Sequence, residues 1–254
     1  MCSAHRQEPQ SSVDWIQVTP VRLLPAGTKG AERWIAKLPP DEVSLALRIG
    51  SGEAQVRFIQ CRIVLRLLLG RLIGEEWYSR PFEYESGGKP ALPAESPVGF
   101  NLAHSGDLAV FALSHSSRNP FQVGVDVERL RPRPGGMDLA RRFFHPDECA
   151  HLGSLPGHRR EAEFLRIWVR KEACLKAVGA GIAGNLASFS AIEVSGRILL
   201  HGNDAVWFQE LGIGIPAAAA LASNRPLPLV SVAPLQTSRH WFEHLSGQDQ
   251  NAGG

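Results

Sequence analysis

Apolar residues recur at helical spacing in three parts of the chain. The longest part runs from Pro40 to about Ile73, and the Gly50–Ser51–Gly52 stretch divides it into two predicted helices. Residues 143–152 predict a further helix. Residues 158–178 predict a longer one, in which Trp168, Leu175 and Val178 form an apolar side.

Strand patterns lie between and after these helices. Residues 98–105 and 108–114 predict two strands, and the Gly106–Asp107 pair between them is typical of a hairpin turn. A third strand is predicted at residues 121–128. The short apolar runs between Phe189 and Leu235 alternate with turn residues, which indicates several more strands.

The arrangement of these elements predicts an α+β fold. The Pro-, Gly- and Arg-rich stretch at residues 129–136 suggests a boundary between two similar halves, which we expect at residues 13–128 and 129–242. Each half would contain a small, mainly antiparallel sheet with packed helices. The polar ends, residues 1–12 and 243–254, are expected to be disordered tails.

The composition argues against nucleic-acid-binding, secreted and membrane proteins. The 254-residue chain is 44% hydrophobic and 20% charged, which suits a folded core, and its net charge of +2 argues against a nucleic-acid partner. Its four cysteines show no paired spacing, which fits reduced thiols. No secretory signal is visible at the N-terminus, and the longest apolar run is interrupted by Arg66, so we expect a cytoplasmic protein without a membrane partner.

The strand at residues 123–128 carries two neighbouring acids. Alternation places the three valines on one face and Gly124, Asp126 and Glu128 on the other, with the two carboxylates about 6–7 Å apart. One interpretation is a strand end whose polar face meets water. The other is a pair of oxygen ligands for Mg²⁺.

A third acid lies on the long helix. Helical spacing puts Glu172 on the same side as Trp168, Leu175 and Lys176. A buried, charged and unpaired glutamate costs several kcal/mol. An ion pair with Lys176 would explain it, and so would a metal ion shared with Asp126 and Glu128. Lys171 and Lys176 would then suit an anionic ligand. Arg62 and Arg66 are interpreted as solvated or snorkelling residues that flank a core helix, outside any site.

Five motifs together resemble the 4′-phosphopantetheinyl transferases of the surfactin-synthetase-activating type. They occur in the order and spacing of that family, across residues 48 to 181: GKPAL (88–92), FNLAHSGD (100–107), GVDVE (124–128), FFHPDE (143–148) and WxxKEAxxK (168–176). The FFHPDE match is loose. Ala103 stands where the family often has serine, which removes one expected contact to phosphate.

The resemblance implies an enzyme of the holo-[acyl-carrier-protein] synthase class. It would be a monomer that moves the 4′-phosphopantetheine arm of coenzyme A onto a serine of an acyl or peptidyl carrier protein and releases adenosine 3′,5′-bisphosphate. Mg²⁺, with Mn²⁺ as an alternative, would be the cofactor. The carrier would be small and acidic, and residues 129–145, with Arg141 and Arg142, are a candidate docking region or simply a linker.

The resemblance also assigns roles to residues. Asp126, Glu128 and Glu172 match the family's metal ligands, and Trp168 matches a tryptophan that shapes the site. Basic residues match the groups that hold coenzyme A or act near its reacting phosphate: Arg48, Arg57, Lys89, His104 and Lys176. Glu172 is the first candidate for the base that takes the serine proton, and Glu148 is the second.

Three other functions share some of these features. A Mg²⁺-dependent phosphohydrolase would share the acidic strand without explaining WxxKEAxxK. A non-catalytic carrier- or nucleotide-binding module would lack one of the three acids, and all three are present. A nucleic-acid binder would need aromatic residues interleaved with basic ones, and the chain has none in that arrangement.

Overall fold

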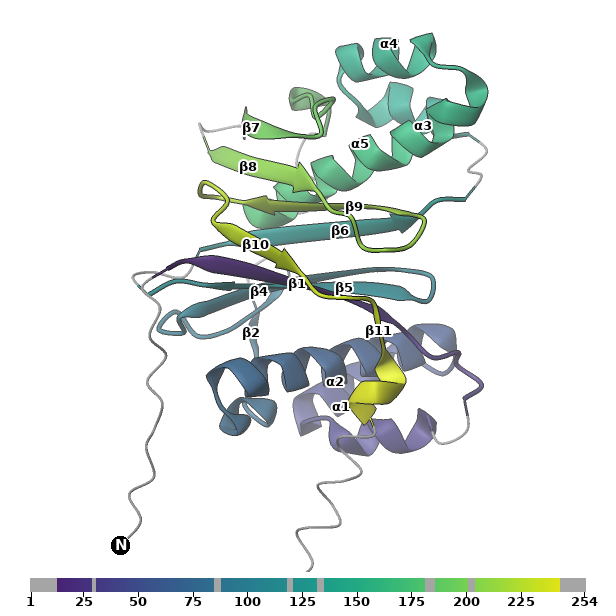
Figure 1. The fold of residues 1–254 in the computed structure, drawn as a ribbon. Helices are drawn as coiled ribbons and strands as arrows, with labels where there is room; N and C mark the ends of the chain where they lie inside the picture. Colours follow the sequence, from purple (N-terminus) through teal and green to yellow (C-terminus); the bar gives the residue numbers. More distant parts are fainter. Residues whose placement is uncertain are drawn as a thin grey trace, which may run out of the picture.

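A computed structural model describes seven ranges of the chain: 13–28, 31–84, 88–117, 121–131, 135–180, 186–200 and 204–242. The two predicted tails lie outside the described residues. Across these ranges no helix has both the length and the apolar character needed to cross a bilayer. The elements form two sheets, each with its own helices (Figure 1).

The first sheet is built around strand β1 (Trp15–Arg22). On one side β1 pairs antiparallel with β5 (Leu108–His115), which pairs in turn with β4 (Val98–Ser105). On its other side β1 pairs parallel with β10 (Leu229–Val232) and β11 (Gln236–Thr237). The end of the chain therefore returns to complete the sheet that its beginning forms.

Two helices lie on the outer side of this sheet, and one of them packs directly on it. Helix α1 (Pro40–Ile49) and helix α2 (Glu53–Ile73) are separated by Gly50 and Gly52, whose positive φ angles of 86° and 115° favour glycine. Buried residues of α2 pack on the sheet, among them Val64, Leu65 and Leu69. Short 3₁₀ helices at Ala31–Lys37 and Glu75–Tyr78 and the small β2–β3 pair (Glu83–Tyr84 and Pro90–Ala91) complete this part.

The second sheet has the order β6-β9-β8-β7 and is antiparallel throughout. Its strands are β6 (Val123–Arg129), β9 (Ala217–Ser223), β8 (Ala205–Glu210) and β7 (Ser195–Leu199). Helix α5 (Gly157–Ala177) lies across it. Helices α3 (Gly136–Phe143) and α4 (Pro146–Ser154) pack beside α5, and a 3₁₀ helix at Leu186–Ser188 follows.

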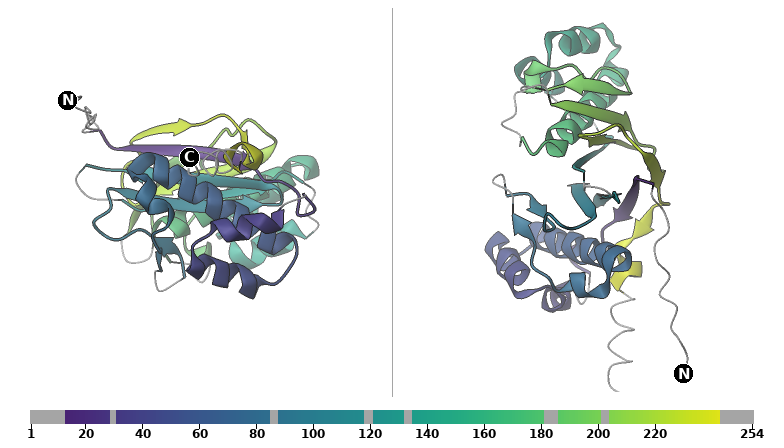
Figure 2. Two further views of the ribbon diagram at one scale, coloured as in Figure 1. Left: turned by 90° about the horizontal axis from the view of Figure 1, so that it is seen from below. Right: turned by 90° about the vertical axis from the view of Figure 1, so that its left-hand side faces the viewer.

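The two sheets face one another at the centre of the molecule. Figures 1 and 2 show α1 and α2 on one outer side and α3–α5 on the other. The inner faces share one buried apolar cluster, which includes Val18 and Val110 from the first sheet and Val125 and Leu221 from the second. In addition, the Val125 amide donates to the Asn101 side-chain oxygen at 2.9 Å, which ties β6 to β4.

Helix α5 approaches β6 closely because both surfaces carry small residues. A Cβ atom at Gly124 would lie 2.5 Å from the Ala177 nitrogen and closer still to the Ala173 carbonyl oxygen. Residues 218, 220 and 222 of β9 are alanines that line the same face. This close approach brings the acidic face of β6 directly beneath the helix that carries Glu172.

The α+β fold class is confirmed, and three details differ from the sequence predictions. Strand β6 pairs within the second sheet, so the predicted boundary after residue 128 divides the chain one strand too late. Strands β10 and β11 belong to the first sheet, although the sequence places residues 129–242 in the second half. Residues 143–152 contain a helix break at Phe144, since Pro146 begins α4 and His145 caps it.

Candidate functional site

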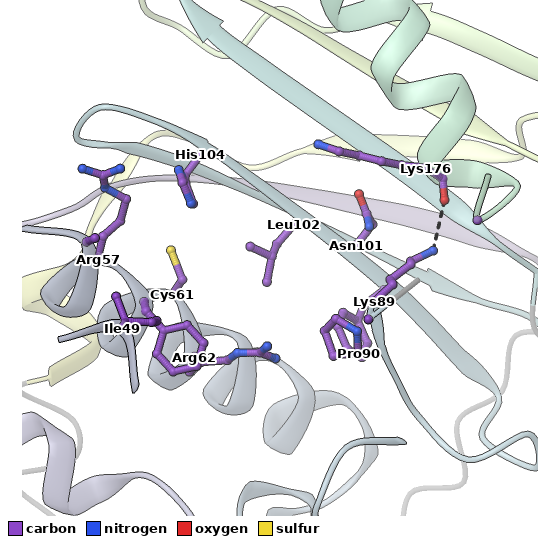
Figure 3. Close-up of a pocket in the computed structure, with 15 residues that line it drawn as sticks. Ile49, Arg57, Cys61, Arg62, Lys89, Pro90, Asn101, Leu102, His104 and Lys176 are labelled. Atoms are coloured by element: carbon purple, nitrogen blue, oxygen red, sulfur yellow. Dashed lines mark hydrogen bonds between the residues drawn. The ribbon is translucent and has the colours of Figure 1, made fainter. Parts of the chain in front are cut away.

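A cavity of about 520 Å³ opens beside the junction of the two sheets. Helix α2 forms one wall, and strand β4, the 88–90 segment and the end of α5 form the others (Figure 3). Its size is that of a small-molecule site. The lining residues combine apolar and basic side chains: Ile49, Ala54, Arg57, Phe58, Cys61, Arg62, Gly88, Lys89, Pro90, Phe100, Asn101, Leu102, His104, Lys176 and Gly179.

Four of the five predicted coenzyme A residues line this cavity: Arg57, Lys89, His104 and Lys176. Figure 3 shows Arg57 and His104 together at one end and Lys89 near Lys176 at the other. Lys89 donates to the Lys176 carbonyl oxygen at 3.1 Å, which links the two halves. The fifth, Arg48, is exposed and does not line the cavity, so its predicted role has no geometric support here.

The surroundings of His104, an exposed residue of β4, favour the neutral form of its imidazole. Burial lowers its pKa, and the positive charge of Arg57 lowers it further. A neutral imidazole donates one hydrogen bond from its N–H group. At this end of the cavity the fixed positive charge therefore comes from Arg57, with His104 as a donor beside it.

Asp126 lies outside the cavity lining, on the face of β6 that α5 covers. It is 8% exposed, and Lys176 donates to its Oδ1 at 2.7 Å and to the Val125 carbonyl oxygen at 3.2 Å. Burial raises the pKa of Asp126 although Lys176 opposes that shift. Lys176 thus connects the acidic strand to the cavity that it lines.

Glu172 is a buried carboxylate with one unsatisfied oxygen. It is 5% exposed, and its Oε1 has no hydrogen-bond partner among the described residues. Burial raises its pKa, and the charges of Asp126 and Glu128 raise it further. The charges of the three acids therefore act on one another. An orphaned carboxylate oxygen beside two more carboxylates is the donor chemistry that a hard divalent cation takes.

Glu128 is oriented by a residue that the sequence analysis did not single out. Ser105, at the end of β4, donates to Glu128 Oε2 at 2.6 Å and accepts from the Arg129 amide at 3.3 Å. Arg129 also forms an ion pair with Asp107 in the β4–β5 turn. The turn of the first sheet thus holds the acidic end of the second.

The acids are not gathered into a ready-made metal cage. No group of three or more His, Cys, Asp or Glu side chains in the described ranges is arranged to hold a metal ion. Instead the Lys176 ammonium group neutralises Asp126. The three side chains suit a cation because all are carboxylates and because Glu172 Oε1 has no partner among the described residues. The roles of Asp126, Glu128 and Glu172 as ligands stay predictions.

Glu148 is not placed to act as a base. It is fully buried, and its oxygens accept from Lys171 at 2.8 and 2.7 Å, from the Ala191 amide at 2.7 Å and from the His145 amide at 2.8 Å. The prediction of Glu148 as the second candidate base is therefore corrected to a structural role. Lys171 is likewise buried in this ion pair, beneath Phe189, and does not contribute charge to the cavity.

Glu148→Gln is expected to lower stability without changing the transfer activity that the sequence motifs predict for the folded protein. Breaking a buried pair from one side leaves Lys171 without its counter-charge and costs about 3–5 kcal/mol. Thermal melting would measure the loss, and activity would be normalised to folded protein. If the folded variant lost its activity by orders of magnitude, the structural role would be contradicted and Glu148 would again be a candidate base.

Trp168 packs away from the cavity-lining set. Its ring lies 6.2 Å from the ring of Phe144 and 6.0 Å from that of Phe164, centroid to centroid. It thereby fixes α5 against α3 and the start of α4. Its role in shaping the site stays a prediction, since it does not line the cavity.

Arg62 and Arg66 are not the solvated residues that the sequence suggested. Arg66 is fully buried, and Arg62 is 9% exposed and lines the cavity. The buried partner that both arginines face is Glu42 on α1, which accepts from Arg66 Nε at 2.7 Å. No spacing rule relates residues on two different helices, so the pattern along the chain did not reveal this contact.

Comparisons with known proteins agree with the motifs. Residues 122–215 match the family model of the 4′-phosphopantetheinyl transferase superfamily. The chain is 44% identical over 151 residues to the 4′-phosphopantetheinyl transferase HetI of Nostoc sp., which covers 58% of this chain and 62% of that protein. It is 35% identical over 181 residues to the 4′-phosphopantetheinyl transferase psf-1 of Bacillus pumilus, covering 69% and 74%.

Proposed function

Since the chain belongs to the 4′-phosphopantetheinyl transferase superfamily, we propose that it transfers the phosphopantetheine group of coenzyme A to a serine of an acyl or peptidyl carrier protein. The observation that carries the proposal is the cavity between the halves. Basic side chains line it, and Lys176 joins it to the acidic strand. Phosphoryl-type transfer needs basic residues that position the phosphates and carboxylates that can hold a metal ion, and a site at this cavity would supply both.

Coenzyme A would occupy the cavity with its phosphates toward the basic residues. Arg57 and His104 would hold phosphate at one end, and Lys89 and Lys176 would face it at the other. The apolar wall of Ile49, Phe58 and Leu102 suits the less polar parts of the ligand.

Mg²⁺ would be held by Asp126, Glu128 and Glu172, with Mn²⁺ as an alternative. Its bound charge would offset the charge that develops on the diphosphate. The raised pKa values of Asp126 and Glu172 fit this assignment, because a cation at that place relieves the repulsion and burial that raise them.

In the transfer step, the serine oxygen of the carrier forms a bond to the phosphorus that bears the pantetheine arm. The bond from that phosphorus to the bridging oxygen breaks, and adenosine 3′,5′-bisphosphate leaves. Lys176 would donate to the phosphate oxygens, and His104 and Arg57 would keep the nucleotide in register. The serine proton would pass to Glu172 or to water.

The carrier would approach a basic surface after β6. Arg141 and Arg142 on α3 are exposed, and Arg141 forms a 3.0 Å ion pair with Asp138. These residues suit a small acidic partner, in keeping with the proposed docking region at residues 129–145, of which 132–134 lie outside the described ranges. A cytoplasmic monomer of the holo-[acyl-carrier-protein] synthase class remains our expectation.

The experiment that tests the function combines the protein, coenzyme A, Mg²⁺ and an apo carrier protein. The intact mass of the carrier should rise by one phosphopantetheine group, and a chelator should prevent the rise. A carrier whose acceptor serine is replaced by alanine is the control. Consumption of coenzyme A without any carrier would instead indicate a phosphohydrolase and reject the proposal.

A further inference from the structure

Arg62 stands out among the residues that line the cavity. It projects from α2 and is 9% exposed, so its charge is largely removed from water. Its guanidinium carbon lies 5.1 Å from the ring centroid of Phe58 and 5.5 Å from that of Phe82. These rings fix the orientation of the guanidinium group and reduce the entropy that it would lose on binding a ligand.

The charge of Arg62 is only partly balanced within the protein. One carboxylate, that of Glu42, faces both Arg62 and Arg66. Arg66 takes the better contact, since its Nε donates to Glu42 at 2.7 Å and its Nη1 to the carbonyl oxygens of Tyr78 and Arg80 at 2.7 and 2.8 Å. Arg62 Nη1 only approaches Glu42 Oε1, at 3.5 Å, and forms no hydrogen bond in the described part of the chain.

Arg62 also occupies its own part of the cavity. Figure 3 shows its guanidinium group pointing toward Pro90 and Lys89, whereas Arg57 points to the opposite end beside His104. Arg62 and Arg57 are five positions apart on one helix, so their side chains leave the axis in different directions. Arg62 therefore does not duplicate the contact predicted for Arg57.

A buried guanidinium group with an unsatisfied donor at a cavity wall is complementary to an anion. We propose that Arg62 binds a phosphate group of the coenzyme A nucleotide. This inference rests on the proposed function, which supplies a ligand with two kinds of phosphate, the 3′-phosphate and the diphosphate. Arg62 is assigned as a ligand-binding residue in addition to Arg57, Lys89 and His104.

The test measures binding by calorimetry in the presence of a chelator and without carrier protein, so that no transfer occurs. Arg62→Met keeps the apolar stem and should weaken coenzyme A binding by about 10-fold or more, the usual contribution of a charge-assisted hydrogen bond. Arg62→Lys should recover much of the affinity, because it restores the charge. Arg62→Gln should not, because it restores only neutral donors.

The two phosphate sources are separated with 3′-dephospho-coenzyme A. If the effect of Arg62→Met disappears with this ligand, Arg62 binds the 3′-phosphate, and if the effect persists, it binds the diphosphate. Arg71→Met removes one charge from the same helix, where Arg71 stacks on Trp241 at 4.3 Å, and should leave affinity unchanged. Thermal melting of each variant without ligand shows how much protein is folded, so that affinity refers to folded molecules.

Two results would overturn the assignment. One is coenzyme A binding by Arg62→Met that equals that of the unmodified protein. The other is an Arg62→Gln variant that recovers as much coenzyme A affinity as Arg62→Lys does. That result would indicate that Arg62 donates to a neutral acceptor, such as the base of the nucleotide. Failure of the unmodified protein to bind coenzyme A or to modify a carrier would instead reject the proposed function, so the two failures are distinguishable.

Discussion

Glu172→Gln is expected to lower phosphopantetheine transfer by about 10²–10³-fold. The substitution keeps the shape of the side chain and removes a charge that would hold Mg²⁺ beside Asp126 and Glu128. Transfer would be followed by the mass of the carrier protein at saturating coenzyme A and Mg²⁺. Glu161→Gln, an exposed position on the same helix, is the matched control and should retain activity. Equal activities of the two variants would remove Glu172 from the site.

The same variant should be more stable than the unmodified protein when no metal is present. Burial and the neighbouring acids give Glu172 a higher pKa in the folded state than the ordinary value of 4.5. A group of this kind contributes its stability below the unfolded pKa and loses it as the pH rises through the folded pKa. At pH 7, where the side chain is charged in the unfolded chain, burying Glu172 therefore costs stability, and glutamine removes that cost.

Melting temperatures at two pH values test this sign. We expect Glu172→Gln to melt higher at pH 7, by about 2–4 °C for each kcal/mol recovered. The difference should shrink toward pH 4, where the unmodified side chain is itself protonated. A lower melting temperature at pH 7 would show that the charged carboxylate stabilises the metal-free fold.

Gly124→Ala is expected to destabilise the protein by about 3 kcal/mol or more, through steric overlap. The new methyl group would lie 2.5 Å from the Ala177 nitrogen and 2.9 Å from the Lys176 carbonyl carbon, so α5 would have to move off β6. That movement would also separate Glu172 and Lys176 from Asp126. Chemical unfolding measures the stability loss, and the transfer assay measures the displacement of the site.

Gly153→Ala is the matched control for this substitution. Gly153 lies on α4, and a Cβ atom there would meet nothing within 4 Å. Alanine is the better helix former, so the control should be neutral or stabilising by up to about 1 kcal/mol. If Gly124→Ala were as well tolerated as the control, the close approach of α5 to β6 would be wrong.

Much of the fold could be predicted from local pattern. The hairpin at residues 98–114, the glycine break between α1 and α2, and the long helix α5 are confirmed almost to the residue, since period and turn chemistry are local properties. Strand β1 was not predicted. It contains Pro20, and its partners β5 and β10 lie about 90 and 210 positions away along the chain. Pairing over such separations leaves no local signal.

The site shows the same division. The alternation of β6 correctly places Gly124, Asp126 and Glu128 on the face that α5 covers. The helical period of α5 does not predict which acid each lysine contacts. Lys171 pairs with Glu148, and Lys176 pairs with Asp126. Ser105 and Arg62 act through contacts between elements, and only the folded chain reveals those.

A crystal structure of the protein with coenzyme A and Mn²⁺ tests the central claim most directly, because manganese is located by its anomalous scattering. The account predicts one anomalous peak in contact with carboxylate oxygens of Asp126, Glu128 and Glu172, with the diphosphate beside it and the nucleotide along Arg57 and His104. A peak bound elsewhere, or coenzyme A outside the cavity between α2 and β4, would contradict it.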